Sequence, residues 1–197
     1  KDARMKVFEY WGSREPYAEY LTAPEAQSLW RRAFHGESML AHWAPIELQR
    51  ALDKPGEPRS KGPVADVTTV NSVIKNCVWS PRARGVLEPH LGHCGEFLPL
   101  NCSEAAWVLF NVTRIIDALD VSKSKLVYSK SEPSKVMAFD EMVFKPEALA
   151  DEIIFRIPQR GSSDVFVTDT FVRLVEAHGL VGFHLKPVWS DEATPGG

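Results

Sequence analysis

The sequence predicts an α+β protein in which helices pack on a largely antiparallel, curved sheet. Between residues 97 and 168, short β-prone apolar runs alternate with polar turns, and these spacings suit antiparallel connections better than the long crossovers of parallel strands. Helical segments with recognisable starts and stops lie at residues 80–91 and 169–178. The segment 151–189 reads as strand, turn, strand, helix and strand, so we expect a C-terminal strand-helix-strand unit.

The N-terminal part is expected to begin with a strand and a helix. Lys6 to Trp11 (KVFEYW) is rich in β-prone residues and predicts the first strand. Thr22 is the expected cap of a helix with Pro24 in its first turn, where a missing amide leaves no bond unmade. Gly36 is expected to end this helix. Its apolar residues recur at helical spacing: Ala26, Leu29, Trp30 and Ala33.

The stretch DKPGEPRSKGP, from Asp53 to Pro63, is the clearest candidate for a linker. It holds three prolines, two glycines and several charges. We therefore expect an N-terminal α/β subdomain at 5–53, a linker or long loop at 54–63, a C-terminal α+β domain at 64–190 and a flexible tail at 191–197. The alternative is a single domain with a mobile loop at this position.

The next helix has a strong start signal, with Ser80 as cap and Pro81 at the first helical position. It is expected to run to about Leu91 and to end at Gly92. Two arginines lie in its first turn, where the helix dipole disfavours cations. These arginines, Arg82 and Arg84, either pair with acidic neighbours or are held for an external anion, and we expect the pairing.

Six strands are expected downstream, at 97–100, 106–112, 125–129, 136–144, 153–157 and 165–168, with a short turn or helix near 146–150. Asp169 is the expected cap of a last helix that buries Phe171, Leu174 and Val175 and ends at Gly179. A final strand is expected at 181–189.

Composition excludes several classes of function. The chain has 197 residues and a formal net charge of −3, so it carries no basic footprint for nucleic acid. No apolar run approaches the roughly 20 residues that span a bilayer. Three cysteines without framework spacing indicate reduced thiols and a cytoplasmic protein.

The sequence contains no recognisable catalytic motif and only one candidate cluster of metal ligands. The one candidate metal cluster, His90, His93, Cys94 and Cys102, lacks the paired ligand motifs of structural zinc, so no metal is expected. No nucleophile motif or phosphate loop is present, and no catalytic or cofactor-binding residue is predicted. The alternative is a hydrolase or ligand-binding enzyme whose site is assembled from dispersed histidine, aspartate and arginine residues, with His42, His90 or His184 beside a carboxylate.

Two sets of residues are candidates for binding a partner. An acidic stretch, opposed in sequence only by Lys145, is either a solvated sheet edge or an anionic patch that steers a cationic partner: Asp140, Glu141, Glu147, Asp151 and Glu152. Three N-terminal tryptophans are either packed aromatics or interface anchors: Trp11, Trp30 and Trp43.

Several short motifs, in order, make the chain from about residue 5 to 189 resemble the eleventh family of immunity proteins from bacterial polymorphic toxin systems. They are Trp43-x-Pro45, Ser80-Pro-Arg82, Phe97-Leu-Pro-Leu100, Phe110-Asn-Val-Thr113, Asp117-Ala-Leu-Asp120, Ile154-Phe-Arg-Ile157, Val165-Phe-Val-Thr-Asp169, Glu176-Ala-His-Gly-Leu180, Gly182-Phe183 and Val188-Trp189. Some members carry paired Cys-x-x-Cys motifs, which this chain lacks. The resemblance implies a non-catalytic inhibitor of a cognate toxin domain. A secretion-system adaptor is a further alternative.

Overall fold

The computed structural model describes residues 4–12, 17–51, 62–71 and 73–191, which form twelve strands, three α-helices and three short 3-10 helices. The predicted α+β class is confirmed. The strands belong to a four-stranded sheet, a closed six-stranded barrel and a separate two-stranded sheet. None of the helices in the described part of the chain has both the length and the apolar composition needed to cross a membrane.

The four-stranded sheet places the first strand of the chain among the last ones. Its order is β10-β11-β1-β12, all antiparallel. These strands are β10 Ile154–Arg156, β11 Val165–Thr168, β1 Lys6–Trp11 and β12 His184–Ser190. Pro187 lies on the edge strand β12, and edge strands tolerate proline better than central strands do. The C-terminal strand-helix-strand unit is therefore completed by β1.

Both faces of this sheet are covered, because alternate residues along a strand point to opposite sides. Val165 and Val167 of β11 belong to one apolar core, shared with the helices and the outer face of the barrel. Phe166 belongs to a second core on the other face. This two-sided burial explains why β10 and β11 are apolar or buried at every position.

The barrel joins strands that are far apart in the sequence, in the closed order β2-β3-β6-β7-β5-β4. Its strands are β2 Glu19–Thr22, β3 Ile46–Arg50, β4 Val67–Val70, β5 Val73–Trp79, β6 Gly95–Asn101 and β7 Val108–Val112. The β2–β4 and β3–β6 pairs are parallel, and the other four pairs of the barrel are antiparallel, in agreement with the predicted largely antiparallel pairing. A third core, including Trp30, Met39 and Trp107, fills the barrel.

Strands from both sides of the predicted linker at 54–63 share this barrel. β2 and β3 precede that segment, and β4 to β7 follow it. Residues 52–61, which make up most of the linker, and residues 192–197 of the predicted tail lie outside the described part of the chain. The division into subdomains stays a prediction, and the shared barrel favours the alternative of one domain.

The first helical segment consists of the 3-10 turn η1 Pro24–Ala26 and helix α1 Gln27–Phe34. Ala23, not Thr22, is the residue before this segment, so the prediction of Thr22 as cap is wrong. Thr22 ends β2, and its hydroxyl oxygen accepts a 2.7 Å hydrogen bond from the amide of Asn71. Gly36 follows α1 with φ of 77°, as the predicted stop requires.

Helix α2 Pro81–Leu91 confirms its predicted start. The Ser80 hydroxyl accepts a 3.1 Å hydrogen bond from the amide of Ala83, a typical N-cap contact. Both first-turn arginines are paired as expected: Arg82 with Asp66 at 2.6 Å, and Arg84 with Glu88 at 2.8 Å.

Helix α3 Asp169–Ala177 begins one residue earlier than the predicted cap at Asp169 implies, so that prediction is wrong. Thr168 holds the cap position, but its hydroxyl donates to the carbonyl oxygen of Glu152 at 2.8 Å and so does not cap the helix. Asp169 is the first helical residue and pairs with Arg173 one turn later. Gly179, with φ of 57°, ends the segment as predicted.

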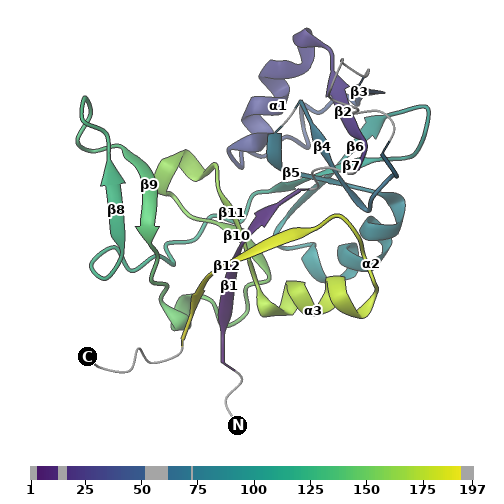
Figure 1. Ribbon diagram of the computed structural model, residues 1–197. Coiled ribbons are helices and arrows are strands. Elements are labelled where there is room, and N and C mark those ends of the chain that lie inside the picture. The colour runs from purple at the N-terminus through teal and green to yellow at the C-terminus, as the bar shows by residue number, and fades with distance from the viewer. Residues whose placement is uncertain (1–3, 13–16, 52–61, 72, 192–197) are drawn as a thin grey trace.

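The remaining strands, β8 Lys125–Tyr128 and β9 Val136–Glu141, form a hairpin that pairs with no other strand in the described structure. Figure 1 shows it standing apart from the barrel and the four-stranded sheet, at the left of the view. The short 3-10 turn η2 Pro146–Ala148 follows it, and another, η3 Gln159–Ser162, connects β10 to β11.

Candidate partner-binding site

The β8–β9 hairpin has an irregular register that frees two side chains of β9. Lys125 pairs with Glu141 but Leu126 with Phe139, and Val127 pairs with Ala138 but Tyr128 with Val136. Asp140 and Met137 therefore have no partner on β8. Such irregularities bend a strand and redirect side chains, and they are over-represented near functional sites.

One face of the hairpin is attached to the body, and the other is open to solvent. Phe139 packs against the core that contains Phe166. The guanidinium carbon of Arg160 lies 5.9 Å from the centre of the Phe139 ring. Tyr128 and Met137 remain 47% and 50% exposed, an apolar surface that the fold itself does not use.

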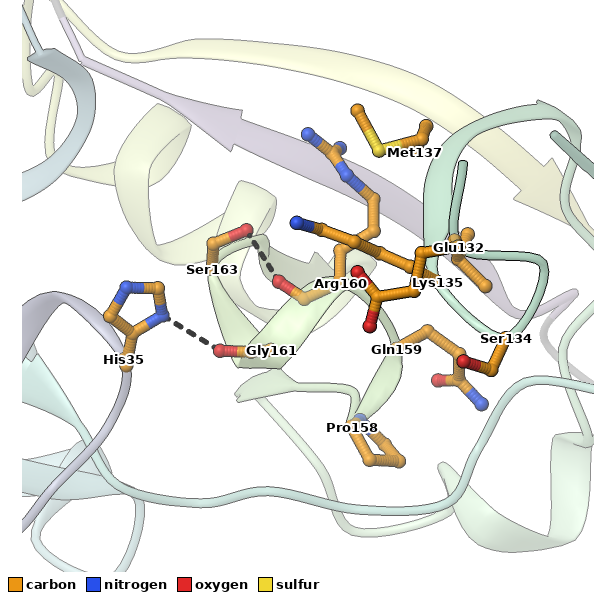
Figure 2. Close-up of a pocket in the computed structure, with 11 residues that line it drawn as sticks. His35, Glu132, Ser134, Lys135, Met137, Pro158, Gln159, Arg160, Gly161 and Ser163 are labelled. Atoms are coloured by element: carbon orange, nitrogen blue, oxygen red, sulfur yellow. Dashed lines mark hydrogen bonds between the residues drawn. The ribbon is translucent and has the colours of Figure 1, made fainter. Parts of the chain in front are cut away.

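An open cleft of about 750 Å³ separates the hairpin from the body. Its walls come from the hairpin turn, from η3 and from the residue after α1, and Figure 2 shows Lys135 and Glu132 extending into it. The lining residues are His35, Glu132, Ser134, Lys135, Val136, Met137, Pro158, Gln159, Arg160, Gly161 and Ser163.

Three consecutive residues of η3, two of which line the cleft, have left-handed backbones. The φ angles of Arg160, Gly161 and Ser162 are 56°, 63° and 57°. Because only the middle residue is glycine, the other two carry a strain of about 1–2 kcal/mol each. Backbone strain of this kind persists only where the surroundings impose it.

Side chains hold each carbonyl group of this left-handed turn. His35 Nδ1 lies 2.8 Å from the Gly161 oxygen, and since a carbonyl only accepts, Nδ1 carries the hydrogen. Arg156 Nη1 donates to the Ser162 oxygen at 2.8 Å, and the Ser163 hydroxyl donates to the Arg160 oxygen at 3.1 Å. Figure 2 shows the His35 and Ser163 contacts as dashed lines. The floor is thus pre-shaped.

A charge network lies behind the floor. Asp164, 1% exposed, pairs with Lys75 and with Arg160, the latter at 2.9 Å. Lys75 also pairs with Glu9 at 2.7 Å. Two carboxylates and two cations balance each other here. In contrast, neither Lys135 nor Glu132 has an ion-pair partner among the described residues.

The cleft offers little for nucleophilic catalysis. The Ser163 hydroxyl is committed to a carbonyl, and the hydrogen bonds of the described residues include none between a cleft hydroxyl and His35. The histidines suggested by the enzyme alternative, His42, His90 and His184, are exposed and lie outside this cleft. What the cleft provides is a shaped surface with charged and apolar side chains.

Residues 102–190 match the model of the immunity protein family Imm11. This match confirms the predicted family resemblance and locates it in the C-terminal half of the chain. The Imm11 segment contains β7 to β12, the hairpin, η3 and α3. Three of the motifs lie upstream of it: those that begin at Trp43, Ser80 and Phe97. No curated protein matches the chain.

The five acidic candidates all lie in the Imm11 segment, but they are not equivalent. Asp140, Glu141, Glu147 and Asp151 are exposed. Glu152 is 8% exposed and pairs with Arg114 at 2.5 Å, so it does not present its side chain to a partner in this conformation.

The surroundings of the acidic stretch are less negative than its sequence implies. Asp140 and Glu141 line a second hollow of about 400 Å³, whose other walls include Arg160 and Lys186. Glu141 also pairs with Lys125 at 2.5 Å. Lys145 is thus not the only opposing charge, because the fold brings cations from distant segments.

The three tryptophan candidates lie outside the Imm11 segment. Trp30 is 5% exposed within the barrel core and is a packing residue rather than an accessible anchor. Trp43 is partly buried and donates from its indole nitrogen to the Pro99 carbonyl at 2.8 Å. Trp11 is partly buried against His184, with a ring-to-ring distance of 5.8 Å.

No ligand cluster forms at the candidate zinc residues. Cys94 is buried in the core beside the helices, whereas Cys102 packs against the barrel core. Within the described ranges, no group of three or more histidine, cysteine, aspartate or glutamate side chains is arranged to hold a metal ion.

Sequence reasoning missed the cleft residues His35, Lys135 and Gln159. The segment around Gly161 was expected only as a turn between two strands. A single glycine predicts at most one left-handed residue, so the sequence did not predict that Arg160 and Ser162 would also be left-handed. His35 lies more than a hundred positions from η3, and only folding brings it to the Gly161 carbonyl.

Proposed function

We propose that this chain is an immunity protein that binds a cognate bacterial toxin domain and neutralises it in a stoichiometric complex, without catalysing a reaction. The observation that carries the proposal is the Imm11 match over residues 102–190. The same segment supplies the hairpin and most of the cleft. As an immunity protein, the chain would act in the cytoplasm of a cell exposed to its own or a sister cell's toxin.

The surface of the Imm11 segment supports recognition of a protein. Exposed apolar side chains such as Tyr128 and Met137 alternate with lysines, serines and carboxylates. Stable protein complexes bury on the order of 1,600 Å² in total, with a few anchors contributing most of the energy. The exposed acidic residues Asp140, Glu141, Glu147 and Asp151 are the proposed steering surface, and Trp11 and Trp43 are proposed contacts at the periphery.

The test is co-expression with the toxin domain encoded beside the gene for this chain. The toxin domain alone is expected to arrest growth of a bacterial host, and this chain is expected to restore growth. The purified pair is expected to elute as one species with a one-to-one mass by light scattering. An immunity protein of another family serves as the control. Unrelieved growth arrest together with the absence of a complex would overturn the proposal.

A further inference from the structure

The cleft between the hairpin and η3 has a floor that is fixed before any partner arrives. The Arg160, Gly161 and Ser162 carbonyls are each held by a side chain, and two of these residues are strained. A pre-shaped site binds more tightly because less ordering is required on association. Retained strain at a surface cleft is a reason to look for a bound partner there.

The floor also contains an unmet hydrogen-bond requirement. The side-chain oxygen of Gln159 is buried and has no hydrogen-bond partner among the described residues. A buried acceptor left unsatisfied is costly. Because the Gln159 residue as a whole is partly exposed, rotation of its side chain toward the cleft would let an N–H donor of a partner remove this cost. An extended polypeptide carries such donors along its backbone.

The hairpin turn beside the cleft has a net positive charge, although the chain as a whole carries −3. This turn, residues 129–135, contains Lys130 and Lys135 against the single carboxylate of Glu132. Neither lysine has an ion-pair partner among the described residues, whereas Arg160 is already neutralised by Asp164. Lys135 extends across the cleft toward Ser163 in Figure 2. Charge complementarity therefore favours an acidic occupant.

An apolar contact lies next to this charge. Met137 lines the cleft, is 50% exposed and has no partner on β8 because of the register shift. Its flexible thioether side chain adapts to irregular surfaces, which makes methionine frequent at binding sites.

We propose that this cleft receives an extended, acidic segment of the toxin, with Lys135 as the ionic anchor and Met137 as the apolar anchor. The proposal rests on the function proposed above. It assigns a second contact surface, which shares Arg160 with the hollow lined by Asp140 and Glu141.

The test is isothermal titration calorimetry of the full chain with the toxin domain encoded beside its gene, recovered from the complex by unfolding and refolding. Lys135→Glu and Met137→Asp are each expected to weaken binding about tenfold or more. Glu132→Lys is expected to bind as tightly as the unchanged chain or more tightly. The matched control is Lys6→Glu, the same change at an exposed lysine of β1, which is expected to stay within about twofold.

Each outcome separates the two proposals. If the unchanged chain does not bind the toxin domain, both the proposed function and the cleft assignment are overturned. If it binds and Lys135→Glu binds equally well, the cleft assignment alone is overturned. Tighter binding by Lys135→Glu with weaker binding by Glu132→Lys would indicate a basic occupant and would also overturn it. Unfolding midpoints of all variants are expected to match, because these side chains are exposed.

Discussion

The Nε atom of Arg156 donates a 2.8 Å hydrogen bond to the carbonyl oxygen of Val112, at the end of a barrel strand. The same guanidinium group donates through Nη1 to Ser162 in the left-handed turn. One buried side chain, 3% exposed, therefore connects the barrel to the cleft floor. Burial lowers the pKa of Arg156 to about 10, still far enough above neutral pH to keep it charged.

Replacing this connection is expected to destabilise the protein and loosen the cleft. Arg156→Met leaves the Val112 and Ser162 carbonyls without their donor, so the free energy of unfolding is expected to fall by about 2–4 kcal/mol. Urea unfolding measures the change. Arg173→Met removes an exposed arginine that pairs with Asp169 and is expected to cost less than about 0.5 kcal/mol. Equal losses in the two variants would contradict the role assigned to Arg156.

Replacing glycine by alanine is expected to have opposite effects on stability at two positions, Gly85 and Gly95. In helix α2, an added Cβ at Gly85 meets nothing within 4 Å, so Gly85→Ala is expected to raise stability by about 0.5–1 kcal/mol through helix propensity. In β6, a Cβ at Gly95 would lie 2.3 Å from the carbonyl oxygen of Asn111. Because that neighbour is backbone on the paired strand, Gly95→Ala is expected to lose about 1–3 kcal/mol. Thermal unfolding of the pair tests both signs.

Alkaline destabilisation is expected to depend on a buried thiol. Burial raises the pKa of Cys77 from 9.0 to about 12, so between these values the unfolded chain ionises while the folded chain does not. Stability contributed by Cys77 is therefore full below about pH 9 and is lost as the pH rises toward about 12. Burial also raises the pKa of its neighbour Tyr10 well above its ordinary value, which adds a loss in the same direction.

Urea unfolding at about pH 8 and about pH 10.5 tests this expectation. Cys77→Val is expected to show a shallower decline in stability between the two conditions than the unchanged chain, although the Tyr10 contribution remains. Cys102→Val is the matched substitution at the half-buried cysteine and controls for loss of a thiol. Identical declines for Cys77→Val and the unchanged chain would exclude the thiol as a cause.

The residues of the acidic stretch are expected to have two different roles: the exposed ones affect the rate of toxin association, and Glu152 affects the stability of the fold. The combined change Asp140→Asn, Glu141→Gln and Asp151→Asn removes exposed charge and is expected to slow toxin association several-fold at low salt and to weaken its salt dependence. Glu152→Gln instead weakens the pair with Arg114 and is expected to lower stability by about 1–3 kcal/mol. Stopped-flow association and urea unfolding distinguish the two. Unchanged association at low salt would rule out steering by these carboxylates.

Local signals in the sequence located most elements correctly. Ser80 and Pro81 predicted the start of α2 because an N-cap and a first-turn proline act within one turn of helix. The strands from β6 to β11 followed from apolar runs between polar turns. The predicted caps of α1 and α3 were wrong. Thr22 ends β2, where its hydroxyl oxygen accepts a hydrogen bond from the side-chain amide of Asn71, and Asp169 is already the first residue of α3.

The sequence by itself determined the α+β class, the positions of most strands and helices, and the family resemblance, because these depend on residue pattern and on neighbours within a few positions. Only the tertiary structure decided the closed barrel, the place of β1 inside the C-terminal sheet, the burial of Trp30 and Glu152, and the cleft below the hairpin. Strand partners and cleft walls are chosen by how well distant segments bury apolar surface and satisfy each other's polar groups. A contact such as that of His35 with Gly161 therefore cannot be predicted from the residues that neighbour either one in the sequence.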